Sequence, residues 1–215
     1  MTNSEKRKKR KKIAIIKISN KGQNFDTMFI MRRIYSYLIL TLIVLISTFI
    51  LWMGVGFLTI YKQYDGPLYV VVAKTLYNPQ AIENLRLEMA IPNKYFAAHL
   101  PLYPALIRIF REIGVIAGVE KLAYLKSMVG VNLLATIGLV IFFYYLLKKF
   151  KLTKNPLLLA SVLLFLPRFL VIRSVGAPES LFILLILLSL FFFEKSSFWL
   201  AGLFGGLATM TKTPG

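Results

Sequence analysis

Residues 34–61 read IYSYLILTLIVLISTFILWMGVGFLTIY, and this uncharged run decides the class of fold. An α-helix rises about 1.5 Å per residue, so roughly 20 apolar residues cross about 30 Å of hydrocarbon. A second uncharged run lies between Lys126 and Lys148. A secretory signal has a shorter apolar core, of about 7–15 residues, followed by a small-residue cleavage site. The first run ends in FLTIY, which is no such site, so we interpret it as a retained membrane span.

The chain of 215 residues is both apolar and basic. Hydrophobic residues make up 57% of it, charged residues 17%, and its mean hydropathy is +0.67, which is too apolar for an ordinary soluble domain. The formal net charge is +18, and eleven Lys and Arg residues precede Ile34. Beside a span, such a cluster marks the cytoplasmic side and attracts anionic lipid headgroups, which we favour over nucleic-acid binding. The absence of cysteine excludes disulfides and cysteine-based metal sites or nucleophiles.

We predict an all-α, polytopic transmembrane helix bundle behind a basic cytoplasmic tail, residues 1–33. The predicted spans cover about 34–61, 122–147, 156–172, 178–193 and 198–211, and residues 62–121 form an extracytoplasmic first loop. Because Lys and Arg in short loops favour the cytoplasmic side, the N-terminus and the lysines of 148–154 face the cytoplasm. The Lys- and Ile-rich, cysteine-free composition favours a prokaryotic plasma membrane over an endoplasmic reticulum membrane.

Residues 101–118 are apolar enough to form a further span, but charged residues interrupt them at Arg108, Arg111 and Glu112. Each charge near the middle of a membrane costs about 2.5–3.5 kcal/mol on an insertion scale. An extra span would also place the later lysine cluster outside. We therefore predict an amphipathic helix on the outer membrane surface.

Charged residues stand at the predicted outer ends of the spans. Asp65 follows the first span and is the only Asp beyond the tail, while Arg173, Glu179 and Lys212 flank the short later spans. A carboxylate there suits removal of a proton from an attacking hydroxyl, and cations suit a phosphate leaving group. The spacing alone leaves alternatives open, because an Asp before Gly-Pro commonly forms a turn. Arg168 and Arg173 are equally consistent with snorkelling at helix ends.

Four stretches resemble motifs of one enzyme family. They read YDGPLYVVVAKTLY (64–77), LPLYPALIR (100–108), PESLF (178–182) and AGLFGGLATMTKTPG (201–215). They are similar, in the same order, to conserved segments of the GPI mannosyltransferase 2 (PIG-V-like) family. The chain departs from that family at Leu76, where the family has Gly, at His99-Leu100, which replaces paired phenylalanines, and at Lys212, which replaces Arg.

The family belongs to the GT-C class of polytopic glycosyltransferases. The resemblance implies inverting transfer of a hexose, such as mannose, from a polyprenyl-phosphate donor to an acceptor on the extracytoplasmic face. It implies that Asp65 is the catalytic base, that the lipid-linked sugar is a substrate and that no separate cofactor is needed. It leaves a divalent metal requirement open, and the single histidine has no second histidine with which to share a metal. The predicted substrate-binding residues are Tyr64, His99, Tyr103, Arg173, Glu179, Ser180 and Lys212.

The sequence is also consistent with functions other than glycosyl transfer. Family members are longer and have more helices, so the resemblance implies an N-terminal half; a truncated, non-catalytic membrane protein or subunit that retains the motifs is the alternative. A transporter would be expected to show paired broken helices in two repeated halves, and no such repeat is evident. In structural terms, Tyr103 fits an interfacial aromatic, Glu179 a carboxylate favoured by the helix dipole, and His99 a local hydrogen bond.

Overall fold

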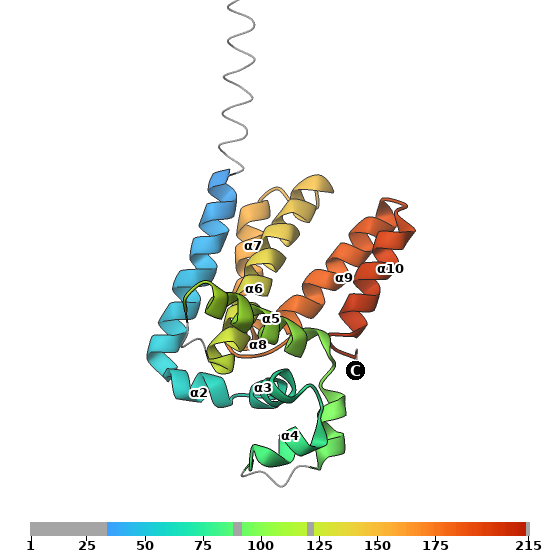
Figure 1. The fold of residues 1–215 in the computed structure, drawn as a ribbon. Coiled ribbons are helices and arrows are strands. Elements are labelled where there is room, and N and C mark those ends of the chain that lie inside the picture. Colours follow the sequence, from blue (N-terminus) through green and yellow to red (C-terminus); the bar gives the residue numbers. More distant parts are fainter. Residues whose placement is uncertain (1–33, 88–91, 120–122, 214–215) are drawn as a thin grey trace, which may run out of the picture. The chain divides into compact units, whose positions relative to one another are not determined.

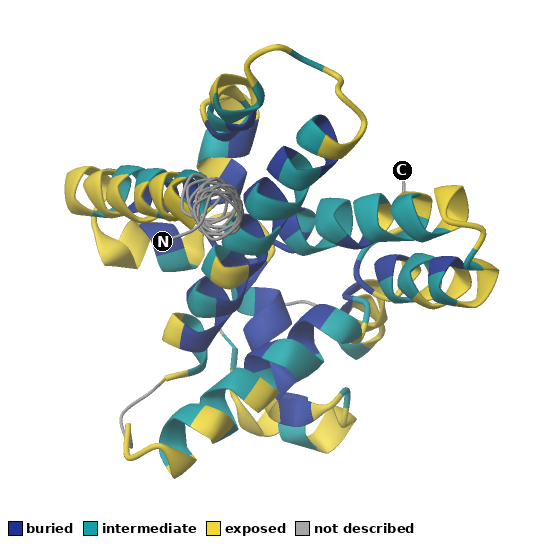
Figure 2. Ribbon diagram, turned by 90° about the horizontal axis from the view of Figure 1, so that it is seen from above, coloured by how far each residue is buried: buried dark blue, intermediate teal, exposed yellow. Residues whose placement is uncertain are grey.

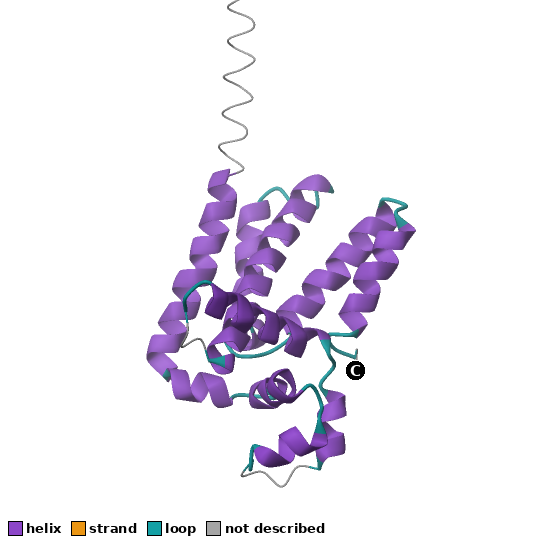
Figure 3. Ribbon diagram, viewed as in Figure 1, coloured by secondary structure: helices purple, strands orange, loops and turns teal. Residues whose placement is uncertain are grey.

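The computed structural model describes residues 34–87, 92–119 and 123–213, and it divides into two compact units, Met1–Ile39 and Leu40–Gly215. The predicted basic tail lies outside the described residues, and residues 34–39 of the first unit are helical. All regular secondary structure in the described ranges is helical, and none of it is strand (Figure 3). The predicted all-α class is therefore confirmed.

Among the described residues, two helices are long and apolar enough to cross a membrane. They are the first helix, Ile34–Val55, with 22 residues, and α6, Tyr124–Lys149, with 26. The first helix was predicted to reach Tyr61, but it stops before Gly56, whose φ of +85° is a left-handed value that glycine adopts without strain. A separate short helix, α2 (Phe57–Lys62), follows this break.

The segments predicted as the last three spans form four shorter helices. These are α7 (Pro156–Leu164), α8 (Pro167–Ile172), α9 (Glu179–Glu194) and α10 (Phe198–Thr209). The prediction of one helix over 156–172 is wrong, because Pro167 lacks an N–H and holds Leu166 in an extended conformation with ψ of 125°. At about 1.5 Å per residue, α9 is roughly 24 Å long and α10 roughly 18 Å, both shorter than a hydrocarbon core of about 30 Å.

The long helices of the second unit alternate in direction (Figure 1). The part of the first helix that belongs to the second unit runs down the view, α6 runs up, α7 down, α9 up and α10 down, while α2, α3 and α4 lie at the lower end. The first helix ends at that lower end, and α6 and α9 begin there. These helices therefore alternate in direction along the chain, and the third predicted span is broken into two helices.

The predicted outer loop is itself helical. It contains α3 (Gly66–Thr75), α4 (Pro79–Asn84), a 3₁₀ helix (Asn93–Ala98) and α5 (Leu102–Ile116). The structure thus places a helix where an amphipathic one was predicted after Pro101. It buries Tyr103 and Ile107 on one face and leaves Ile109, Ile113 and Ile116 exposed.

A hydrophobic core lies around α3, which is buried along almost its whole length. Tyr69 of α3, Tyr103 of α5 and Met128 of α6 meet in it, and Figure 2 shows buried residues near the centre of the view. Gly66 permits a close backbone approach, since a methyl group there would lie 3.1 Å from the carbonyl oxygen of Gly176. The start of α3 is therefore held against the turn that joins α8 to α9.

Large apolar side chains are exposed on several helices of the second unit. Exposed apolar surface of this extent marks a surface for a partner or a membrane. Together with the two long apolar helices, it indicates association with a membrane. The residues include Leu42, Leu45, Ile46, Phe49, Ile50, Met53, Leu158, Leu159, Val162, Leu190, Phe193, Phe198, Trp199 and Leu203.

Candidate functional site

Asp65 occupies the N-cap position of α3, but its side chain caps nothing. Its backbone carbonyl accepts hydrogen bonds from the N–H groups of Leu68 and Tyr69, at 3.0 and 3.1 Å, while its carboxylate makes no capping hydrogen bond. The side chain is exposed, as is that of the neighbouring Tyr64. Residues four apart share a helix face, so Asp65 and Tyr69 lie on the same side of α3. The carboxylate is therefore accessible to a ligand beside Tyr69.

Tyr69 is a central residue of the site that the sequence analysis did not select. Its ring meets the His99 ring edge-on, with centroids 4.9 Å apart, and the Tyr103 ring edge-on at 5.1 Å. Both arrangements are favourable for aromatic pairs. The aromatic residue four positions after Asp65 was visible in the resembling motif, but its contacts with the distant His99 and Tyr103 were not.

His99 is almost completely buried, with 3% of its surface exposed, and its Nδ1 atom has no hydrogen-bond partner among the described residues. Burial lowers the pKa of His99 below its usual 6.5, although nearby Asp65 and the carbonyls of Phe96 and Tyr95 oppose this change. The imidazole is therefore neutral at pH 7. The backbone carbonyl of His99 accepts a hydrogen bond from the Tyr77 hydroxyl at 2.6 Å, and this bond fixes the loop around His99.

Glu179 and Lys212 form an ion pair at the same end of the unit. Lys212 Nζ lies 2.5 Å from Glu179 Oε1, and the side chains are 42% and 24% exposed. The other carboxylate oxygen, Glu179 Oε2, is buried without a hydrogen-bond partner in the described part of the chain. Glu179 begins α9, where the helix dipole favours a negative charge. The Leu102 N–H donates to the Met210 carbonyl at 3.0 Å, which joins the start of α5 to the segment that carries Lys212.

The carboxylates of Glu179 and Asp65 both raise the pKa of the Tyr69 hydroxyl. Burial raises the pKa of Tyr69 well above its ordinary value of 10, and the negative charges of Glu179 and Asp65 raise it further. Burial likewise raises the pKa of Tyr103, with smaller effects from Tyr69 and Glu179. These phenols therefore stay protonated and can donate hydrogen bonds, as Tyr103 does to the Met128 carbonyl.

Three predicted substrate-binding residues are engaged in contacts within the protein. The Tyr103 hydroxyl donates to the Met128 carbonyl at 3.0 Å, and the buried Ser180 hydroxyl pairs with that of Thr136 at 2.8 Å. The guanidinium of Arg173, 1% exposed, donates to the Leu164 carbonyl at 3.0 Å, to the Thr48 hydroxyl at 2.6 Å and to the Ser47 hydroxyl at 2.8 Å. These contacts account for the burial of all three side chains and favour structural roles for them.

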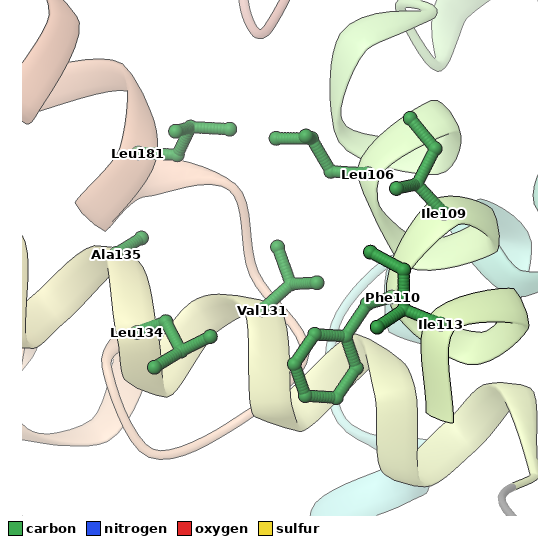
Figure 4. A pocket seen from close by; sticks show the side chains of 8 residues that line it. All are labelled: Leu106, Ile109, Phe110, Ile113, Val131, Leu134, Ala135 and Leu181. Carbon is green, nitrogen blue, oxygen red and sulfur yellow. The ribbon is translucent and has the colours of Figure 1, made fainter. Parts of the chain in front are cut away.

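An apolar cleft lies next to these residues, between α5, α6 and α9. Its volume is about 330 Å³. Figure 4 shows side chains from the three helices facing one another across it. Leu181 follows Ser180 directly, and Leu106 lies one turn after Tyr103, so the cleft begins where the polar site ends. The lining residues are Leu106, Ile109, Phe110, Ile113, Val131, Leu134, Ala135 and Leu181.

Within the described ranges, no group of three or more His, Cys, Asp or Glu side chains could hold a metal ion. Comparisons of the chain with protein families, with characterised proteins and with solved structures find no match. The functional assignment therefore depends on the geometry of the site and on the four sequence motifs.

Proposed function

We propose that this chain is a membrane glycosyltransferase of the GT-C type, which transfers a hexose such as mannose from a polyprenyl-phosphate donor to an acceptor. The observation that carries the proposal is that the start of α3, with Asp65 and Tyr69, packs against His99 and against the turn that leads to the Glu179–Lys212 pair. These residues lie in or next to the four stretches that resemble PIG-V-like motifs, and the four stretches are widely separated in sequence. Their closeness in the structure supports one common site, rather than four chance similarities to the motifs of that family.

In this proposal the chain crosses the membrane several times. The first helix, α6, the α7–α8 pair, α9 and α10 are the spans, with the N-terminus and its basic tail in the cytoplasm against anionic lipid headgroups. Their alternating directions (Figure 1) support this topology, which leaves Asp65 and Glu179 on the extracytoplasmic side. A prokaryotic plasma membrane is the proposed location.

Asp65 is the proposed catalytic base. Its carboxylate accepts the proton of an acceptor hydroxyl while that oxygen forms a bond to the anomeric carbon of the donor sugar. The bond from this carbon to the phosphate oxygen breaks on the opposite face, and the lipid phosphate leaves with the bonding electrons. One direct displacement inverts the anomeric configuration and requires no covalent enzyme intermediate. The carboxylate of Asp65 is exposed and makes no capping hydrogen bond with α3, which supports this role.

The apolar cleft supports a lipid-linked donor. Ligand sites for apolar groups are concave and lined mainly by apolar side chains, as this one is. A polyprenyl chain in the cleft would bring its phosphate towards the end of the cleft near Lys212, the cation of the site. The polar reaction and the apolar carrier would then occupy adjoining spaces.

The test is the substitution Asp65→Asn, which keeps the size of the side chain and removes its basicity. Transfer of mannose from undecaprenyl-phosphate mannose, measured in proteoliposomes, should fall by about 100-fold or more, the scale of general base catalysis. Asp26→Asn, the same change in the tail, is the matched control and should leave transfer unchanged. Normal transfer by Asp65→Asn at equal abundance would contradict the proposed role.

A further inference from the structure

Two buried polar atoms near Tyr69 lack hydrogen-bond partners among the described residues. They are Nδ1 of His99 and Oε2 of Glu179. Buried polar groups in folded proteins are nearly always satisfied, because an unpaired one has given up its hydrogen bonds with water and gained none in their place. These atoms belong to different elements, the loop before α5 and the start of α9, and both elements reach the core around Tyr69. The His99 ring packs on the Tyr69 ring, and Ala177, two residues before Glu179, lies in the same core as Tyr69. Their lack of partners indicates a place for a polar ligand.

The Tyr69 hydroxyl differs from those of neighbouring tyrosines. The hydroxyls of Tyr77 and Tyr103 donate to the backbone carbonyls of His99 and Met128. In the described structure, the Tyr69 hydroxyl has no such partner, although the residue is only 7% exposed and its ring is held by two aromatic contacts. Its position under the influence of both carboxylates leaves a rigid, unused donor in the site.

The charge of the site distinguishes between kinds of ligand. Asp65 and Glu179 contribute two negative charges, and Lys212, already paired with Glu179, contributes one positive charge. Arg173, the other predicted phosphate-binding cation, is directed to Thr48, Ser47 and Leu164 instead. An anionic phosphate at Tyr69 would meet a net negative surrounding, which disfavours it. A sugar hydroxyl, by contrast, can donate to a carboxylate and accept from a phenol.

We infer that Tyr69, His99 and Glu179 form a binding site for the hydroxyl groups of a neutral sugar acceptor, rather than for the phosphate of the donor. This inference rests on the proposed function for its choice of a sugar as the ligand. Glu179 Oε2 accepts a hydrogen bond from one acceptor hydroxyl, and the Tyr69 hydroxyl donates to another. Asp65, on the same face of α3 as Tyr69, is then positioned to deprotonate the hydroxyl that attacks the donor.

The experiment uses saturation-transfer difference NMR on the purified full chain in detergent, with two small probes. Methyl α-D-mannopyranoside stands for the acceptor sugar, and methyl phosphate stands for the phosphate group. The mannoside should give a saturable signal, and Tyr69→Phe and Glu179→Gln should each weaken its binding about tenfold, the effect of one lost hydrogen bond to a buried or charged group. Tyr95→Phe removes a hydroxyl from the same aromatic cluster, outside the site, and should change nothing.

Several results would overturn the inference. They are the absence of mannoside binding to the unsubstituted chain, full binding by a natively folded Tyr69→Phe variant, and methyl phosphate binding that depends on Tyr69. Thermal denaturation of each variant separates loss of a contact from loss of folding, and Glu179→Gln provides a second test if Tyr69→Phe is unstable. Transfer from undecaprenyl-phosphate mannose is measured on the same preparations. Tyr69-dependent mannoside binding without transfer contradicts the proposed enzyme only, and transfer that is unaffected by Tyr69→Phe contradicts this inference only.

Discussion

Individual polar residues at this site divide into two groups by their hydrogen bonds. Tyr103, Ser180 and Arg173 have protein partners and are buried because of them. His99 and Glu179 each keep a buried atom without a partner in the described ranges, and the His99 ring packs against that of Tyr69. The sequence analysis selected all of these residues except Tyr69. Only the packing in the structure separates those with structural roles from those available to a ligand.

Acidification should destabilise the protein through His99. Burial lowers the pKa of His99 in the folded state below the unfolded value of 6.5, so folding favours the neutral ring. Its contribution is complete above pH 6.5 and is lost as the pH falls below 6.5 towards the folded pKa, because the unfolded chain takes up the proton first. Thermal denaturation in detergent at pH 7.5 and pH 5.0 should therefore show a larger fall in Tm for the unsubstituted protein than for His99→Gln. Equal falls in the two proteins would contradict this role, since carboxylate titration is common to both.

At the level of elements, two breaks shape the site. The first, at Gly56, separates the first helix from α2, after which the chain reaches Asp65 and α3. The second, before Pro167, separates α7 from α8 and leaves the Leu164 carbonyl to be satisfied by Arg173. Arg173 also bonds to Ser47 and Thr48 of the first helix, so it joins a broken helix to an intact one.

Arg173→Ala should destabilise the protein strongly. It leaves the Leu164 carbonyl and two hydroxyls without their donor, at about 1–3 kcal/mol for each group that stays buried and unsatisfied. Arg173→Lys should not restore stability, because an ammonium lacks the planar fork that reaches three acceptors. Thermal denaturation in detergent measures both effects, with the exposed Arg168→Ala as the control. A full Tm for Arg173→Ala, with weakened donor binding, would restore Arg173 to the substrate site.

At the level of the whole second unit, the candidate residues come together because successive helices alternate. Asp65 follows the end of the first helix, His99 and Tyr103 precede α6, Glu179 begins α9, and Lys212 follows α10. Each of these chain positions lies at the same end of the alternating helices (Figure 1). In the proposed topology, one span more or fewer between them would place Asp65 on the opposite side of the membrane from Glu179 and Lys212.

Single-cysteine labelling in intact cells tests that topology, and the cysteine-free sequence makes it direct. Cysteine at the exposed position Asn84, in α4, should react with a membrane-impermeant maleimide added from outside. Cysteine at Asn155 or Ser196, both exposed in the loops at the opposite helix ends, should react only after the membrane is permeabilised. Asn84 and Ser196 labelled from the same side would contradict the proposed arrangement of spans.

The sequence by itself determined the helical class, the two long apolar helices and the helix after Pro101. It also located α9 and α10 to within one or two residues of their ends. These features depend on local composition, since an uncharged run of twenty residues or a proline acts on its own segment. The sequence analysis missed the breaks in the first and third predicted spans, because the apolar composition continues through each break. In the structure a local change of backbone conformation interrupts the helix there.

The tertiary structure decided how the polar residues are used. Nothing in the chain near Arg173 indicates that Thr48 accepts its hydrogen bond, and nothing near Tyr69 indicates that His99 and Tyr103 hold its ring. Such contacts join residues far apart in sequence and depend on how helices pack, which local patterns do not encode. The 34–61 run thus indicated a membrane protein, whereas its packing against Arg173 and the turn before α9 positions the candidate site.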